Sequence, residues 1–178
     1  MRQHQTADLT IPMMGTIAIT VRDAATREIR RQMTIRNKIT YLAADLLVEL
    51  LAQRTTDPAP TTGLVYSMRM GSSSTAAARS DTNLGAYTIG KALGDVDKVT
   101  GARGEIQFLT TLETGDANGT TLREAGLFTA GGTPSTSDTP GITPGACRMI
   151  ARQVYPDVTK TISVVVDYSW TLAFTAVP

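Results

Sequence analysis

The stretch MRMGSSSTAAARSDTNLG, residues 68–85, contains the residue types of a phosphate-binding loop. A strand-like start runs into a glycine, three serines and several small residues. A P-loop requires Gly-x4-Gly-Lys-Ser/Thr, because the lysine must reach the β- and γ-phosphates and the hydroxyl must hold magnesium. After Gly71 no Gly-Lys pair follows at that spacing, and the Rossmann glycine pattern is also absent. The stretch therefore predicts a small-residue loop between two strands, and nucleotide binding is the disfavoured alternative.

Nucleophilic and metal chemistry is limited by the cysteine and histidine content. Cys147 is the only cysteine and His4 the only histidine, and His4 belongs to a polar leader. One histidine leaves no Ser-His-Asp triad and no zinc-binding histidine pair. A lone cysteine is usually a small buried apolar residue, so a catalytic Cys–His pair is the weaker interpretation. We expect no disulfide within the chain and no metal site.

Paired carboxylates are the remaining route to catalysis, as in glycoside hydrolysis. The segment EIQFLTTLETGD offers Glu105, Glu113 and Asp116. Their positions match the edges and the turn of a hairpin, where solvated acidic residues are ordinary. We therefore predict no catalytic, cofactor-binding or metal-ligating residues, no small-molecule substrate, and a protein that is not an enzyme. An enzyme stays open as an alternative, which pH-dependent turnover abolished by a single carboxylate change would reveal.

Positive charge is concentrated in residues 22–38, which hold six basic residues against two acidic ones. One interpretation is a solvated hairpin whose edge charges block unwanted strand pairing. The other is an arginine-rich contact with an acidic partner surface, for which the candidates are Arg27, Arg30, Arg31 and Arg36. Nucleic acid is a weaker candidate for that partner, because no aromatic residue interleaves the arginines for base stacking. Arg31 also lies at a position of its strand where the alternation predicts an apolar residue.

Alternation with a period of two predicts that strands position most of these residues. Residues 15–36 are predicted to form a β-hairpin, with the apolar residues of GTIAITV on one face. From residue 64 onward the pattern is β again, and Asn118-Gly119 marks a second hairpin. The final segment alternates without interruption from Ile162 to Phe174. A strand of that length favours a bend or a bulge, either within a sheet centre or beyond the domain against a neighbour.

One segment has helical periodicity instead. NKITYLAADLLVELLAQR spaces leucines at i, i+4 and i+8 from Leu42, which predicts an amphipathic helix over about 40–53 that covers a sheet edge or an open face. The two prolines of TTDPAPTTG end it. Residues 131–145 are predicted to form a long Gly/Pro/Ser/Thr-rich loop, and residues 1–14 a flexible N-terminal arm. The arm and the loop are further candidates for partner contact.

Length and composition are those of one globular domain, with 178 residues, 42% hydrophobic and 19% charged. The formal net charge of +1 gives no global attraction to nucleic acid or acidic lipid. No apolar run approaches a membrane span, and the N-terminus lacks the apolar core of a secretory signal. The expected fold is mainly β: a single antiparallel β-sandwich-like domain over residues 15–178, with one amphipathic helix and an extended N-terminal arm.

Three motifs share an order and spacing with a known family. A strand that ends in glycine and a Thr/Ser/Ala loop leads to an Asp-Thr-x-Leu-Gly turn, here residues 81–85. A Glu-Ala-Gly-Leu-Phe strand follows at residues 124–128. An Arg-x-x-aromatic-Pro segment from Arg152 then leads to a terminal Trp-Thr-Leu-x-Phe strand, residues 170–174. Over roughly residues 35–174 the chain resembles small bacteriophage virion proteins, variously described as tail-fibre-like, collar or baseplate-associated.

The resemblance implies a structural role and carries no catalytic residues. It implies a virion component, assembled in the bacterial host cytoplasm, that packs in multiple copies at the tail, neck or baseplate or anchors a fibre. Its partners would be further copies of itself and other virion proteins, with no membrane. Two other classes stay open. A capsid decoration protein would cover the head lattice in far more copies, and a carbohydrate- or receptor-binding module would need exposed aromatic platforms.

Overall fold

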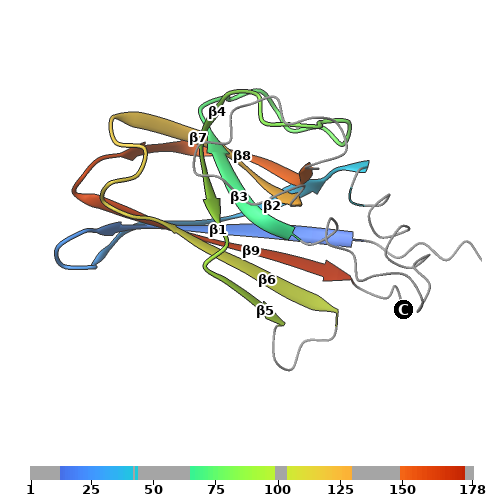
Figure 1. Cartoon of the computed structure of the whole chain (residues 1–178), viewed down its shortest axis with the longest axis horizontal. Helices are drawn as coiled ribbons and strands as arrows, with labels where there is room; N and C mark the ends of the chain where they lie inside the picture. The colour runs from blue at the N-terminus through green and yellow to red at the C-terminus, as the bar shows by residue number, and fades with distance from the viewer. Residues whose placement is uncertain (1–12, 42, 44–64, 99–103, 130–148, 175–178) are drawn as a thin grey trace, which may run out of the picture.

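The computed structural model of the chain describes residues 13–41, 43, 65–98, 104–129 and 149–174. These residues are mostly β-strand, and Figure 1 shows how the strands wrap around one interior. The strands are, in chain order, β1 (Met13–Asp23), β2 (Ile29–Ile39), β3 (Val65–Gly71), β4 (Tyr87–Ala92), β5 (Asp95–Lys98), β6 (Glu105–Leu112), β7 (Thr120–Thr129), β8 (Met149–Lys160) and β9 (Val164–Phe174).

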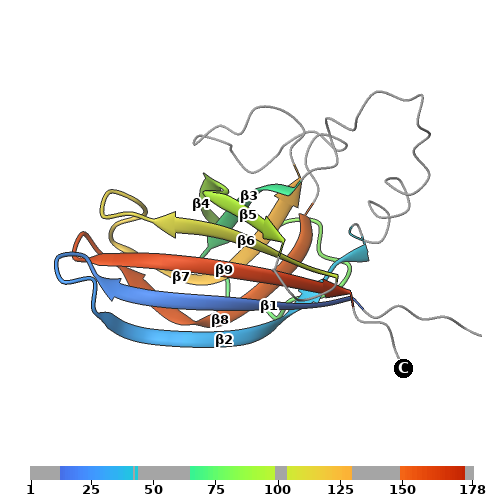
Figure 2. The same ribbon diagram turned by 90° about the horizontal axis from the view of Figure 1, so that it is seen from below.

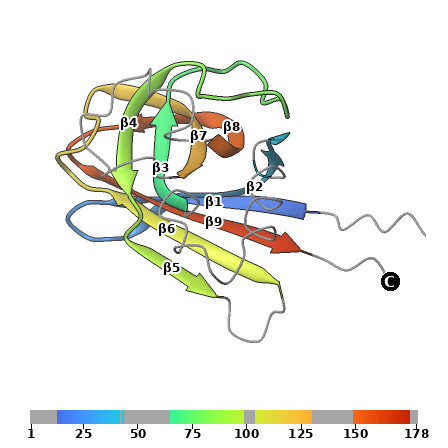
Figure 3. The same ribbon diagram turned by 45° about the vertical axis from the view of Figure 1, so that its right-hand side comes forward.

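All nine strands belong to one sheet, in the order β4-β3-β7-β8-β2-β1-β9-β6-β5, and every pairing is antiparallel. The sheet curls until its two ends approach each other. At one end β4 runs through Leu93 and Gly94 into β5 at the other end, as Figure 3 shows. The Gly94 N–H donates to the Leu109 carbonyl oxygen of β6 at 2.8 Å, which ties the crossing to the far edge. The sheet is therefore a nearly closed antiparallel barrel.

The interior is filled by alternate residues of each strand, as the period of two requires. Ile17 and Ile19 of β1 lie opposite Trp170 and Tyr168 of β9, and Trp170 lies opposite Phe108 of β6. All five side chains are buried, and they belong to one continuous apolar cluster. The hydrophobic alternation of the sequence thus describes the inside of a barrel.

The prediction of a mainly β, antiparallel fold is confirmed, but its layering differs. Two separately packed sheets were expected, whereas the described strands form one curled sheet. The difference arises at β2, which pairs with β1 along its length and with β8 at its end. β2 thereby joins two halves that would otherwise be the layers of a sandwich, and alternation within single strands carries no information about such a junction.

The predicted hairpin over residues 15–36 is confirmed as β1 and β2, which pair from Gly15 and Asn37 to the turn. β1 begins at Met13, so the last two residues of the predicted arm, 1–14, belong to the strand, and the remainder of the arm lies outside the described residues. The loop predicted at 131–145 also lies outside them.

The predicted helix lies outside the described residues except for its beginning. Thr40 is buried, its backbone N–H donates to the Ile150 carbonyl oxygen at 3.0 Å, and its hydroxyl donates to the Met149 carbonyl oxygen at 2.6 Å. The Ala43 N–H then donates to the Thr40 carbonyl oxygen at 3.2 Å. The chain therefore turns at Thr40, where the helix was expected to start.

The last strand, β9, is an interior strand of the sheet and lies between β1 and β6. A bend or a bulge was expected in it, and it pairs with both neighbours without the register shift that a bulge would cause. Irregular register occurs in the β1–β2, β3–β4, β3–β7 and β7–β8 pairs instead. Ile162 was assigned to the apolar face, but it precedes the strand and is 73% exposed.

Candidate functional site

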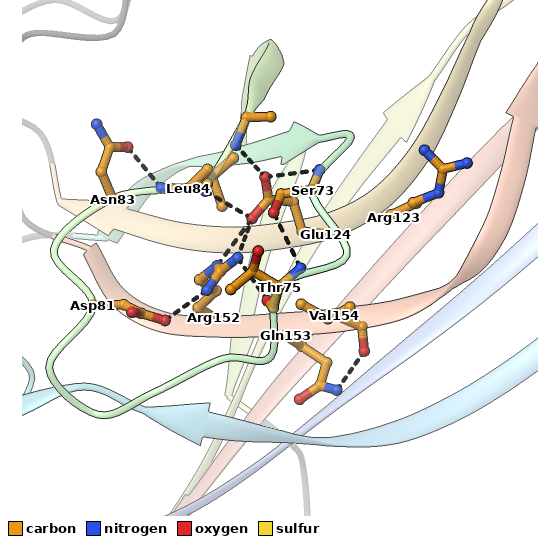
Figure 4. Close-up of polar contacts among 12 residues, drawn as sticks. Ser73, Thr75, Asp81, Asn83, Leu84, Arg123, Glu124, Arg152, Gln153 and Val154 are labelled. Atoms are coloured by element: carbon orange, nitrogen blue, oxygen red, sulfur yellow. Dashed lines mark hydrogen bonds and ion pairs between the residues drawn. The ribbon is translucent and has the colours of Figure 1, made fainter.

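The loop at residues 72–86 closes around a carboxylate that belongs to the protein itself. Glu124 projects from β7 beneath the loop and has no exposed surface. Its Oε1 accepts hydrogen bonds from the backbone N–H groups of Ser73 at 3.3 Å and Ala86 at 2.7 Å, and its Oε2 accepts one from Gly85 at 3.0 Å. Figure 4 shows these bonds converging on one side chain. Three backbone donors of the loop that could have cradled a phosphate are therefore already occupied.

A guanidinium from the next strand completes this arrangement. Arg152 of β8 is 2% exposed, and its Nε and Nη2 donate to Glu124 Oε2 at 2.9 and 2.7 Å. Its Nη1 donates to Asp81 Oδ2 at 2.7 Å, and Nη2 also donates to the Thr75 carbonyl oxygen at 3.1 Å. We call the group of Glu124, Arg152, Asp81 and the loop backbone the Glu124 clasp. It fastens both ends and the middle of the loop to β7 and β8.

Two glycines allow the loop to approach the carboxylate so closely. A Cβ on Gly71 would lie 2.3 Å from the Ala86 carbonyl oxygen and 2.5 Å from Glu124 Oε1. A Cβ on Gly85 would lie 2.6 Å from the Ser73 hydroxyl oxygen. These are distances that carbon atoms do not adopt, so both positions require glycine for space rather than for an unusual φ.

Apolar packing supports the clasp from one side. Leu84, the leucine of the Asp-Thr-x-Leu-Gly turn, is buried against Phe128 and Met149. The guanidinium carbon of Arg69 lies 4.5 Å from the centroid of the Phe128 ring, which is a cation–π distance. The turn is thus anchored by a leucine as well as by hydrogen bonds.

The charges of the clasp stabilise one another. Burial disfavours the charged form of Asp81, but the Ala78 N–H and the Arg152 guanidinium donate to it and lower its pKa below the ordinary value. Burial likewise opposes the charge of Arg152, and its hydrogen bonds with Asp81 and Glu124 outweigh that cost and raise its pKa. The buried ion pair of Arg152 and Glu124 is thus supported by hydrogen bonds from the loop backbone to Glu124 and from Arg152 to Asp81, which fits a structural element.

The four arginines predicted to contact a partner lie on the β1–β2 hairpin, but they do not gather into one cluster. Arg27 lies in the turn with a φ of 61°, and Arg30 pairs with Asp23. Arg31 lies on the inward-facing phase of β2, opposite Val21, and its Nη1 donates to a carbonyl oxygen of β8. Arg36 is exposed farther along β2. The positive charge of the hairpin is therefore spread along the turn and β2.

Asp23 organises the turn of this hairpin. Its Oδ1 accepts from the Ala25 and Thr26 N–H groups at 2.9 Å each, and its Oδ2 pairs with Arg30. The hydrogen bond from Thr26, followed by those from Arg30 and Ala25, lowers the pKa of Asp23 to about 2. This carboxylate therefore stays charged and neutralises one of the candidate arginines.

Of the three carboxylates considered for catalysis, Glu105 is separated from the other two by the length of β6. Glu105 and Glu113 lie at opposite ends of β6, Glu105 as its first residue and Glu113 just after its last. Asp116 Oδ2 pairs with the Lys91 ammonium at 2.9 Å and accepts the Glu113 N–H at 2.8 Å. Glu113 and Asp116 lie in the hairpin turn that the sequence predicted. Cys147 and His4 lie outside the described residues.

Lys160 is a buried cation that the sequence analysis did not single out. It has no exposed surface, and its Nζ donates to the Thr161 carbonyl oxygen at 3.0 Å and to Asn118 Oδ1 at 3.3 Å. Burial lowers its pKa, while the nearby charges of Asp116 and Glu113 oppose that shift. Its bonds hold the end of β8 to the β6–β7 turn.

Within the described ranges, no group of three His, Cys, Asp or Glu side chains is arranged to hold a metal ion. Among the same residues, no helix has the length and apolarity needed to cross a membrane. Comparison with protein-family models, with curated proteins and with solved structures finds no match for this chain. The site is therefore interpreted from its own geometry.

Proposed function

We propose that this chain is a structural component of a bacteriophage particle, which assembles in multiple copies at the tail, neck or baseplate or anchors a fibre. One observation carries the proposal. The residues on which the virion-protein resemblance rests, including Asp81, Glu124 and Arg152, bond to one another inside the fold. Motif residues that bond to one another inside the fold serve its shape, and a barrel built in this way fits a subunit whose task is assembly.

The position of the aromatic residues supports this function over carbohydrate binding. Sugar-binding modules present aromatic rings to solvent, whereas Tyr155, Tyr168 and Trp170 are buried inside this barrel. Tyr155 and Tyr168 share a hydrogen bond between their hydroxyls at 3.0 Å. Among the large apolar side chains of the described residues, those exposed are Met14, Ile29, Tyr41 and Ile162. One exposed tyrosine makes a poor sugar platform.

The remaining parts of the proposal concern segments at the periphery. We infer that residues 40–53 continue from the turn at Thr40 as an amphipathic helix, and that residues 1–12 extend from β1 as an arm. The two halves of the barrel are joined by two paired residues of β2 and β8. Arm, helix and strand edges are the elements by which such subunits can associate.

The proposal is tested by measuring the mass of the purified chain in solution by light scattering, with and without purified particles of the phage that encodes it. We expect a defined oligomer, or co-sedimentation with tails but not with empty heads. Co-sedimentation with heads would indicate a decoration protein. A monomer that binds neither tails nor heads would contradict a virion role.

A further inference from the structure

One side of β2 lacks backbone pairing over most of its length within the described chain. β2 pairs with β1 from Ile29 to Asn37, but only Lys38 and Ile39 pair with β8 on its other side. Figure 2 shows β2 along the margin of the molecule, next to β1. The backbone of residues 29–37 is therefore unpaired on that side, and the Arg31 side chain crosses to the Asp157 carbonyl oxygen of β8. An unpaired strand edge is a template for pairing with another chain.

The hydrogen bond at the end of β2 shows which backbone N–H and C=O groups of the strand point toward the unpaired side. The Thr40 N–H donates to the Ile150 carbonyl oxygen of β8, which points it away from β1. Because backbone groups alternate in direction along a strand, Arg36, Thr34 and Gln32 also direct their N–H and C=O groups away from β1. Three consecutive alternate residues thus offer both a donor and an acceptor at the open edge.

The two faces beside this edge differ in chemistry. Met33 and Ile35 lie opposite Ile19 and Ile17, so they face the core, yet they are only partly buried. Thr34, Arg36 and Lys38 lie on the other face and are exposed. A strand added here would cover apolar side chains with one of its faces and meet two cations with the other.

The charge at this edge is not balanced within the described residues. Arg30 pairs with Asp23, and Arg31 donates to the Asp157 carbonyl oxygen. In that part of the chain, neither Arg36 nor Lys38 has a carboxylate partner. Pairing of β2 with β2 of a second copy would set these cations near each other, and like charges on neighbouring strands are unfavourable. The charge therefore favours an acidic occupant over a second copy.

We propose that the open edge of β2 binds an extended segment of another virion protein that alternates apolar and acidic residues. The segment adds as a strand beside residues 32–37, with its apolar side chains over Met33 and Ile35 and its carboxylates near Arg36 and Lys38. Main-chain hydrogen bonds supply affinity, and the alternate side chains supply specificity. This inference rests on the proposed assembly function and specifies the chemistry of one partner.

The probe is a fluorescent peptide of alternating valine and glutamate, titrated at low salt, with a valine–lysine peptide as its control. We expect the glutamate peptide to bind, and the lysine peptide not to bind. Arg36→Glu and Lys38→Glu should each weaken binding about tenfold or more, which is about 1.4 kcal/mol. Arg79→Glu, an equal charge change in the loop at 72–86, should leave the affinity within about twofold.

A second variant separates strand addition from charge attraction alone. Thr34→Pro removes one outward N–H while the bonds to β1 remain, since proline is tolerated on edge strands in that orientation. Thr34→Val keeps the N–H and controls for the side chain. We expect Thr34→Pro to abolish binding and Thr34→Val to retain it. In the complex, the Thr34 and Arg36 amides should become protected from hydrogen exchange.

Three outcomes would overturn the inference. Binding by Thr34→Pro at unchanged affinity would show a purely electrostatic contact, and binding of both peptides alike would show that the edge lacks charge selectivity. A fall in the solution mass of Thr34→Pro would show that the edge joins two copies of this chain. If peptide binding fails while the chain still enters particles, the inference is wrong and the proposed function stands. If the chain binds peptide but never enters particles, the proposed function is wrong.

Discussion

Replacing Glu124 with glutamine tests whether the clasp holds the fold together. The change keeps the size of the side chain and removes its charge. One of the two carboxylate oxygens becomes an NH₂ group, and each oxygen now accepts at least two hydrogen bonds. Whichever oxygen is replaced, at least two donors face another donor, and the buried guanidinium of Arg152 keeps only Asp81 as its anion.

The expected cost is large. Each buried polar group left without a partner costs about 1–3 kcal/mol, and removing one partner of a buried ion pair costs about 3–5 kcal/mol. We expect Glu124→Gln to lower the free energy of unfolding by about 3–5 kcal/mol, against a total that is typically about 5–15 kcal/mol. Glu28→Gln, at an exposed position of the hairpin, should change it by less than about 0.5 kcal/mol.

The assay is urea unfolding followed by tryptophan fluorescence, because Trp170 is the only tryptophan and lies in the core. A double-mutant cycle with Arg152→Met isolates the coupling between the two side chains, which we expect to be about 1–3 kcal/mol. A loss below about 1 kcal/mol for Glu124→Gln, or a coupling near zero, would refute the reasoning that this buried pair fastens the loop.

Three further predictions address space and charge. Gly71→Ala should destabilise the protein by about 1–3 kcal/mol, because the added Cβ would meet the Ala86 carbonyl oxygen. Gly115→Ala has open space around the added Cβ and should be nearly neutral. Thermal melting of the two variants compares their stabilities. The pKa of Asp81 is lowered in the folded protein, so the contribution of Asp81 to the free energy of unfolding is complete above about pH 4 and is lost as the pH falls through the folded pKa. Asp81→Asn should therefore flatten the acid limb of a series of urea unfolding curves measured at different pH values. Burial raises the pKa of Tyr168, so the contribution of Tyr168 to the free energy of unfolding is present below about pH 10 and is lost at higher pH. Tyr168→Phe should therefore reduce the loss of stability at alkaline pH, followed by tyrosinate absorbance.

The sequence predicted the strands better than it predicted their closure. The alternation in the segment that became β9 was clear because nearly every second residue faces the core. Whether the strands make two layers or one barrel depends on two residue pairs between β2 and β8 and on the short step from β4 to β5. Such contacts are distant in sequence and leave no periodic pattern.

Part of the Glu124 clasp could be predicted from the sequence. The loop was correctly predicted to be a crossing between strands, and Glu124 and Arg152 were both noticed as motif residues. Their pairing was missed because each is a single charge within a buried strand, and no spacing rule joins residues on different strands. A charged residue on a buried strand must find a partner, so Glu124 and Arg152 could have been matched on that ground.

The arginines of the β1–β2 hairpin were noticed in the sequence, but their contacts could not be predicted from it. Arg31 was noticed as a charge on the apolar phase, and the structure places it at the seam between β2 and β8, where it bonds a carbonyl oxygen. Arg30 was grouped with it because of sequence proximity, yet it is engaged by Asp23 in the turn. Exposure and pairing depend on neighbouring strands, which the count of charges does not include.

The most direct test of the virion assignment is quantitative mass spectrometry of gradient-purified phage particles, with antibody labelling in the electron microscope. A structural subunit predicts a fixed copy number of this chain in every particle, with label at the tail, neck or baseplate. If intact, infectious particles contain none of it, the chain is not a part of the particle and the barrel must serve another purpose.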